Sequence, residues 1–225
     1  MSRIRIAIIG AALLGTGACT SSQRSIYSVE QSAEEAYGTG QYQLAAREYA
    51  EVVQRRPGKT STRIKLAETY LALGEPAKAR EHLEIAYTIW PKDDRVINNL
   101  VRAMIESGDA PAATKLLQAH ADRYGAVKDY IRLGKAYTAA GDFDRAERSL
   151  IMAAQLDRGQ SDGPQIALAE MYQQAGDTDR ALQRWRMALY ANPYNQRASE
   201  AIRSAGHIPG PTFAIPPTEL RADAG

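Results

Sequence analysis

Small and bulky apolar residues recur along most of the chain with a period of about 34 residues. Five glycines mark this period at spacings of 34, 34, 33 and 35 residues: Gly40, Gly74, Gly108, Gly141 and Gly176. An alanine follows each glycine after five residues, and a Leu, Tyr or Trp follows after nine. Because a step of four residues keeps two side chains on one face of a helix, the pattern predicts a helix after every glycine.

A second helix is predicted before most of these glycines. Four leucines share the position eight residues before a glycine, and three tyrosines share the position four residues before one. Glycine accepts the positive φ with which many helices end, and Asp109, Asp142 and Asp177 stand where they can cap the following helix. Prolines close three of the five units. Together, these signals predict an all-α fold of helix pairs over residues 26–195.

This combination of turn glycines, small residues and aromatic positions resembles the tetratricopeptide repeat (TPR). The resemblance implies an α-solenoid of about five helix-turn-helix repeats, whose first helices line a concave groove. Residues 196–205 are expected to form a capping helix, with Ala198, Ala201 and Ile202 covering the last pair. Four prolines among small polar residues follow, so residues 206–225 are predicted to be a disordered or extended tail.

The first 18 residues have the layout of a signal peptide. Arg3 and Arg5 precede an apolar run over residues 6–14, and small residues then lead to Cys19, the single cysteine. The segment resembles a bacterial lipoprotein signal, which implies lipidation of Cys19 and a polar tether over residues 19–25. By the same resemblance, Thr20 and Ser21 suggest the periplasmic face of the outer membrane of a Gram-negative bacterium. An uncleaved anchor or an ordinary secreted protein is the alternative.

Composition and charge narrow the possible functions. The 225 residues are 44% hydrophobic and 24% charged, which is too apolar for a mainly disordered chain. One cysteine excludes a disulfide framework. The net charge of +2 gives no reason to expect a nucleic-acid partner. Removal of residues 1–18 takes away Arg3 and Arg5 and no acidic residue, so the mature chain is expected to be nearly neutral.

Candidate catalytic chemistry is missing from the sequence. His82, His120 and His207 lie in different units or in the tail, and His120 occupies a position where other units pack a small residue. The motifs of hydrolases, metalloproteases and nucleotide-binding proteins do not occur. We therefore expect no catalytic residues, no metal and no cofactor, and a protein that is not an enzyme.

The predicted groove has a basic centre. Its candidate partner-binding residues, taken from the first helices of the middle units, are Arg95, Asn98, Asn99, Arg102, Ile105, Lys128, Ile131, Arg132 and Lys135. Acidic residues flank this centre at Glu30, Glu34, Glu68 and Glu170. The aliphatic residues among these candidates could cover a partner segment or help to pack successive units. The charged ones could bind a partner or form an ordinary solvated face.

Three residues of the basic centre, Asn99, Lys128 and Arg132, match a motif known from some TPR proteins. They occupy three of the five positions of the carboxylate clamp, which holds the C-terminal carboxylate of a peptide. The remaining two positions carry Ile64 and Glu68. Because Glu68 would repel a carboxylate, a complete clamp is not expected, but Lys128 and Arg132 remain candidates for pairing with an acidic group of a partner.

These observations predict a lipid-anchored periplasmic adaptor that binds a segment of another envelope protein. A five-repeat lipoprotein of this size resembles the TPR lipoprotein of the tight-adherence (Tad/Flp) pilus system and the pilotins of secretins. The resemblance implies a secretin or another pilus assembly protein as the partner. Two alternatives share the same fold and anchor: a scaffold of the outer-membrane β-barrel assembly machine, and a non-catalytic regulator of peptidoglycan enzymes.

Overall fold

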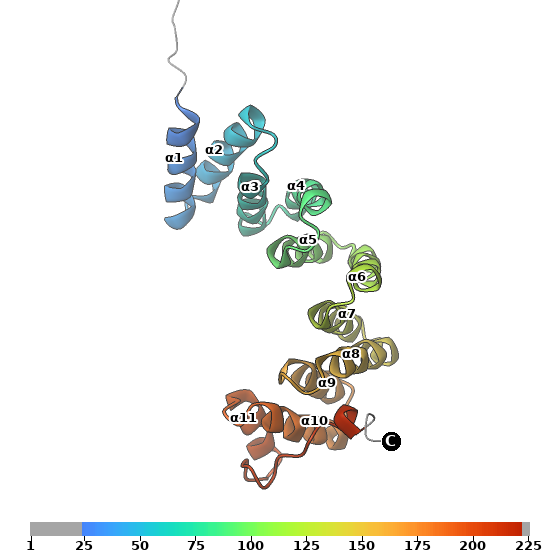
Figure 1. The fold of residues 1–225 in the computed structure, drawn as a ribbon. Helices are drawn as coiled ribbons and strands as arrows, with labels where there is room; N and C mark the ends of the chain where they lie inside the picture. Colours follow the sequence, from blue (N-terminus) through green and yellow to red (C-terminus); the bar gives the residue numbers. More distant parts are fainter. Residues whose placement is uncertain (1–23, 222–225) are drawn as a thin grey trace, which may run out of the picture.

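The computed structural model describes residues 24–221, which form a curved stack of antiparallel helix pairs (Figure 1). Five pairs follow one another, as the sequence predicts. Their helices are α1 (Ile26–Gly38) and α2 (Tyr42–Arg55), α3 (Thr60–Ala72) and α4 (Pro76–Ile89), α5 (Asp94–Glu106) and α6 (Ala110–Tyr124), α7 (Val127–Ala139) and α8 (Phe143–Asp157), and α9 (Gly163–Gln174) and α10 (Thr178–Ala191). A final helix, α11 (Gln196–Ser204), and a short 3₁₀ helix, η1 (Thr218–Arg221), complete the described chain. The all-α solenoid is thereby confirmed.

The turn inside each pair follows the predicted chemistry. All five periodic glycines have a positive φ, between 72° and 85°. At Gly74 the amide of the next residue, Glu75, donates to the carbonyl of Tyr70 at 2.9 Å, which closes the end of α3. Asp109, Asp142 and Asp177 accept hydrogen bonds from backbone amides of the first turns of α6, α8 and α10. The predicted aspartate caps are therefore confirmed.

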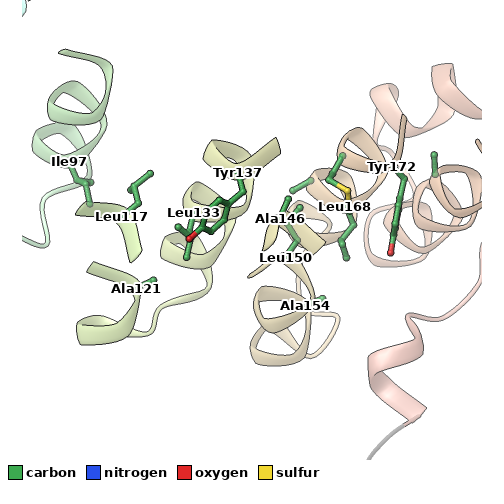
Figure 2. Packing of buried hydrophobic residues seen from close by; sticks show 13 residues of the cluster. Ile97, Leu117, Ala121, Leu133, Tyr137, Ala146, Leu150, Ala154, Leu168 and Tyr172 are labelled. Atoms are coloured by element: carbon green, nitrogen blue, oxygen red, sulfur yellow. The ribbon is translucent and has the colours of Figure 1, made fainter. Parts of the chain in front are cut away.

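The core runs through the stack between neighbouring helices (Figure 2). Leu117, Leu133, Leu150 and Leu168, which come from four successive helices, are almost completely buried. Gly134 of α7 shows why a small residue is needed between the helices of a pair, because a Cβ atom there would lie 2.4 Å from Cγ of Leu150. Each pair leaves apolar surface that only the next pair covers, so the repeats stabilise one another.

One core position holds a polar network. His120 of α6 is buried, and its Nδ1 lies 2.8 Å from the hydroxyl of Tyr87 on α4. Its Nε2 lies 3.3 Å from the buried carboxylate of Asp129 on α7. Burial lowers the pKa of His120, although Asp129 acts in the opposite direction. A neutral ring that accepts from Tyr87 and donates to Asp129 satisfies both contacts, so His120 joins α6 to α4 and to α7.

The C-terminal end agrees with the sequence only in part. Helix α11 covers the last pair with Ala198 and Ile202, both completely buried, as expected of a cap. It ends like the first helix of a sixth pair, since Gly206 has a φ of 83°. The segment that follows differs from the expected disordered tail. From Gly206 to Arg221 it folds back along α10 and ends in η1 (Figure 1).

Specific contacts explain why this C-terminal segment is ordered. Phe213 packs against the apolar cluster of α10 and α11, and its ring lies 4.5 Å from the guanidinium carbon of Arg186. Arg186 also donates to the carbonyl of Phe213 at 2.8 Å. Further on, Glu219 pairs with Arg184 at 2.7 Å, with both side chains nearly buried. These few contacts outweigh the low apolar content from which disorder was expected.

The expected signal peptide and the lipidation residue Cys19 lie outside the described residues, as do residues 222–225. Of the helices between residues 24 and 221, none combines the length and the apolar character that crossing a membrane requires. The described chain begins at Arg24, whose guanidinium pairs with Glu48 and Glu51 of α2. The N-terminal segment is therefore tied to the first repeat immediately before α1.

Candidate functional site

The first helices of the repeats form the inner side of the curve, and the second helices form its outer side (Figure 1). The sequence-predicted groove residues all belong to inner helices α5 and α7. This common surface is the candidate functional site. The following contacts show how its charged side chains are held.

Arg95 and Asn99 of α5 both bind Glu68 of α3. The guanidinium of Arg95 pairs with both carboxylate oxygens of Glu68, and Asn99 donates to one of them at 2.8 Å. The hydrogen bond and charge of Glu68 raise the pKa of Arg95. Glu68 was expected to repel a bound carboxylate, and in the structure it is itself the carboxylate that these two residues bind.

Lys128 and Arg132 of α7 are held in the same way by α5. Lys128 pairs with Asp94 at 2.7 Å. Arg132 bonds to Asp94, to the side-chain oxygen of Asn98 at 2.8 Å and to Asp129 at 2.8 Å. The hydrogen bond from Lys128 is the main reason why the pKa of Asp94 is lowered. The three residues that match the carboxylate clamp therefore bind carboxylates of their own chain.

These pairs belong to a series that joins every inner helix to the next. We call it the inner charge ladder. From the N-terminal to the C-terminal end it consists of Lys59 and Lys65 with Glu30 and Glu34, Arg95 with Glu68, Lys128 and Arg132 with Asp94, and Lys135 and Arg197 with Glu170. Each rung links neighbouring repeats, so the expected basic centre is neutralised within the chain.

Two candidates and one further residue are accessible to a partner and lie outside the inner charge ladder. Among residues 24–221, Arg102 pairs only within its own helix, with Glu106 at 2.6 Å, and its side chain is 55% exposed. Ile105, one turn further along α5, is 47% exposed. Tyr37 of α1 is also exposed at this surface. Burial raises the pKa of its phenol, whereas the nearby charges of Arg95 and Arg102 act to lower it. A basic and apolar patch is thereby available on the inner surface.

The other candidates are more structural than the sequence suggests. Ile131 packs against the core instead of lining the groove, and Ile64 is buried. Arg132, with a side chain only 17% exposed, connects α5 to α7. In contrast, Lys128 and Lys135 are more than half exposed. The carboxylates that pair with these two lysines and with Arg95 differ in exposure: Asp94 is 50% exposed, whereas Glu68 and Glu170 are each 19% exposed.

Sequence reasoning missed the role of Asp94, the carboxylate that pairs with Lys128 and Arg132. The period itself could have found it, since equivalent residues of successive repeats lie side by side. Asp94 and Lys128 are 34 residues apart, and so are Asn98 and Arg132. For the part of the chain that the structure describes, no group of three or more His, Cys, Asp or Glu residues could hold a metal ion.

Comparisons with known proteins agree with this architecture. Family models described as tetratricopeptide repeat match residues 36–86, 130–163 and 163–187. No curated protein matches the chain in sequence. These matches extend from the end of α1 into α4 and from α7 into α10.

Solved structures show the same fold. A tetratricopeptide repeat protein from Parabacteroides merdae has a TM-score of 0.60 at 12% identity and covers 87% of this chain and 82% of its own. The MamA protein has a TM-score of 0.57 at 21% identity, with 76% and 94% covered. YrrB, described as a TPR protein with an unusual peptide-binding site, has a TM-score of 0.53 at 13% identity, with 80% and 92% covered. Helix pairs, family models and these neighbours agree that the chain carries tetratricopeptide repeats, stacked as an α-solenoid.

Proposed function

We propose that this protein is a lipid-anchored, non-enzymatic adaptor whose inner surface holds an acidic and apolar segment of an envelope protein. The observation that carries the proposal is the patch of Arg102, Ile105 and Tyr37, which is exposed inside the curve and adjoins the ladder at Arg95. Repeat solenoids use such concave surfaces for binding. A neighbour in fold, YrrB, is described as having a peptide-binding site.

The inner charge ladder suits exchange with a partner. Ion pairs that solvent can reach contribute about 0–1 kcal/mol each. A carboxylate of a partner can therefore replace Asp94 beside Lys128 at little cost, because both side chains of this pair are about half exposed. The aliphatic side chain of Ile105 would then be covered by an apolar residue of the same segment. A segment with both acidic and apolar residues can therefore contact the cations and the exposed isoleucine of this surface together.

The location and the pathway come from the N-terminal sequence and the resemblance stated above. Lipidation of Cys19 would place the solenoid on the periplasmic face of the outer membrane. Together with the five repeats, it supports a role in Tad/Flp-type pilus assembly, with a secretin subunit as the partner. Loss of membrane retention on Cys19→Ser tests the anchor, because the protein should then move to the soluble periplasmic fraction. Unchanged retention would argue against lipidation.

Charge reversal on the inner surface tests the binding site. Arg102→Glu with Lys135→Glu should reduce co-purification of the secretin from cells that carry a Tad/Flp system. The matched control is Lys115→Glu with Arg148→Glu, which makes the same change at exposed residues of outer helices α6 and α8. Arg132 is unsuitable for this test, because its bonds to Asn98 and Asp94 hold α7 to α5. Equal losses from both variants would mean that binding is not confined to the inner surface.

A further inference from the structure

The solenoid has two edges of different chemistry. At one edge lie the turns inside the pairs, where Asp109, Asp142 and Asp177 cap the second helices. Negative side chains belong there because the N-terminus of a helix carries a partial positive charge. At the other edge lie the junctions between repeats, where the second helices end. We call this second edge the junction edge, and it includes the N-terminus of α1 (Figure 1).

The junction edge of the first two repeats exposes large apolar side chains. Tyr27 at the start of α1 is 77% exposed, Ile89 at the end of α4 is 50% exposed and Trp90 directly after it is 41% exposed. Arg63 of α3 donates to the carbonyl of Pro57 and lies against His82 of α4. The junction after α2 is thereby held close to the second repeat, and the three exposed side chains all lie on the junction edge.

In the described part of the chain, the charges at this surface without an ion pair are two cations and Asp93, which caps the start of α5, so their sum is positive. Glu48 and Glu51 of α2 form ion pairs with Arg24, and Glu51 also pairs with Arg55. Among residues 24–221, no ion pair engages Arg56, which follows α2. Lys92, after α4, has no carboxylate partner in that range either, and its ammonium group lies 5.1 Å from the ring centre of Tyr124.

The chain length between Cys19 and Arg24 limits how far this surface can lie from a lipid on Cys19. A fully extended chain spans about 3.3–3.6 Å per residue. Five residues therefore reach at most about 18 Å, and Arg24 is already fixed to α2. A lipid at Cys19 would thus keep the N-terminal end of α1 next to the headgroup layer, whatever path the tether takes.

We propose that the junction edge of the first two repeats lies on the phospholipid surface that anchors the protein, and that it prefers anionic headgroups. This inference rests on the proposed lipidation of Cys19. Tyr and Trp favour the membrane interface, where their rings are partly buried and their polar groups stay hydrated. Lys and Arg near the surface gain from anionic lipids, so Arg56 and Lys92 select the lipid, whereas the aspartates of the opposite edge face away.

The two tryptophans of the chain make the contact measurable. Trp90 belongs to the proposed contact, whereas Trp185 is only 3% exposed inside α10. The full protein, purified with its lipid, is incorporated into vesicles of phosphatidylethanolamine and phosphatidylglycerol whose acyl chains carry bromine close to the headgroup. We expect the bromine to quench Trp90. The quenching should persist in Trp185→Phe and disappear in Trp90→Phe.

Charge and anchoring are tested on the same vesicles. Arg56→Gln with Lys92→Gln should lower the docked-to-undocked ratio by roughly 30-fold, which corresponds to about 1 kcal/mol for each cation. Brominated vesicles of phosphatidylcholine alone should quench Trp90 of the unaltered protein less than the vesicles that contain phosphatidylglycerol. The matched control is Lys115→Gln with Arg148→Gln on the outer helices, which should leave the quenching unchanged.

The possible outcomes separate this inference from the proposed function. Protein that sediments with the vesicles but shows no quenching of Trp90 would overturn the membrane-facing edge and leave the anchor intact. Protein that does not sediment would overturn both the lipid anchor and this inference. Capture of the secretin, measured on the same preparation, reports on the inner surface alone, because Arg56 and Trp90 lie at the junction edge.

Discussion

Both ends of the solenoid are closed by an arginine–carboxylate pair between a residue outside the repeats and the second helix of a terminal repeat. At the N-terminal end Arg24, just before α1, pairs with Glu48 and Glu51 of α2. At the C-terminal end Glu219, in η1, pairs with Arg184 of α10. The two pairs have the same chemistry but differ in the exposure of the arginine, which is 49% for Arg24 and 12% for Arg184, whereas Glu48 and Glu219 are both nearly buried.

Burial decides what each pair does for stability. An exposed pair gains little over its hydrated ions. A buried pair must stay complete, because removal of one partner leaves a charge without water or a counter-ion. Gln165 of α9 also donates to Glu219, so the C-terminal contact joins three elements. Of the two pairs, only the C-terminal one has both side chains nearly buried.

The largest expected effect is therefore at the C-terminal end. Arg184→Leu should lower the free energy of unfolding by about 3–5 kcal/mol, because Glu219 then stays buried without a partner. The double variant Arg184→Leu with Glu219→Leu should recover most of that loss, since no charge remains to be buried. Chemical denaturation followed by circular dichroism measures both. Equal stability of the two variants would contradict the role of the buried charge.

Acidification should weaken the C-terminal pair by protonating Glu219. Burial alone would raise the pKa of Glu219, but the hydrogen bond and charge of Arg184 outweigh it, so that its pKa lies below the ordinary 4.5. A carboxylate with a lowered pKa stabilises the fold above its unfolded pKa and loses this contribution as the pH falls through its folded pKa. Glu219→Gln should remove this part of the pH dependence.

Acidification should cause a second loss of stability, which begins at a higher pH than the loss at Glu219. His120 has a folded pKa below the ordinary value of 6.5, mainly because it is buried. The unfolded chain therefore binds a proton first as the pH falls below about 6.5, and stability decreases from there. Because Glu219→Gln should leave this step unchanged, unfolding curves of both proteins between pH 7 and pH 3 would separate the two contributions.

The smallest effect is expected at the N-terminal end. Arg24→Ala should change the melting temperature less than Arg184→Leu, because the lost side chain is half exposed and Glu51 can turn to water, although the side chain of Glu48 is only 10% exposed. Added salt screens exposed pairs more than buried ones, so the difference from the unaltered protein should shrink further in salt. A loss comparable to that of Arg184→Leu would show that exposure does not distinguish the two ends.

The repeats could be predicted from the sequence because their causes are local and periodic. A glycine such as Gly74 is required by a positive φ, and an aspartate such as Asp142 by the amides of a helix start. These requirements recur with every unit, so five weak signals in register became one strong one. The cap α11 was found for the same reason, because Ala198 and Ile202 continue the helical spacing of apolar residues.

The C-terminal segment and the state of the groove could not be obtained in this way. Phe213 and Glu219 are ordered by Arg186 and Arg184, which lie about 30 residues away in the chain and carry no periodic mark. In the groove, residue type alone indicated a free basic centre. The cations are paired instead, because Asp94 of one repeat lies beside Lys128 of the next. Pairings of this kind depend on the stacking of the repeats.

The central claim is that the inner surface of the solenoid binds the partner, and site-specific photo-crosslinking tests it most directly. A photoreactive residue at position 105 lies on inner helix α5, and one at position 152 lies on outer helix α8. The native side chains are similarly exposed, at 47% for Ile105 and 41% for Met152. We predict a crosslink to the envelope partner from position 105 and none from position 152. A crosslink from position 152 alone, or equal crosslinks from both positions, would contradict the account.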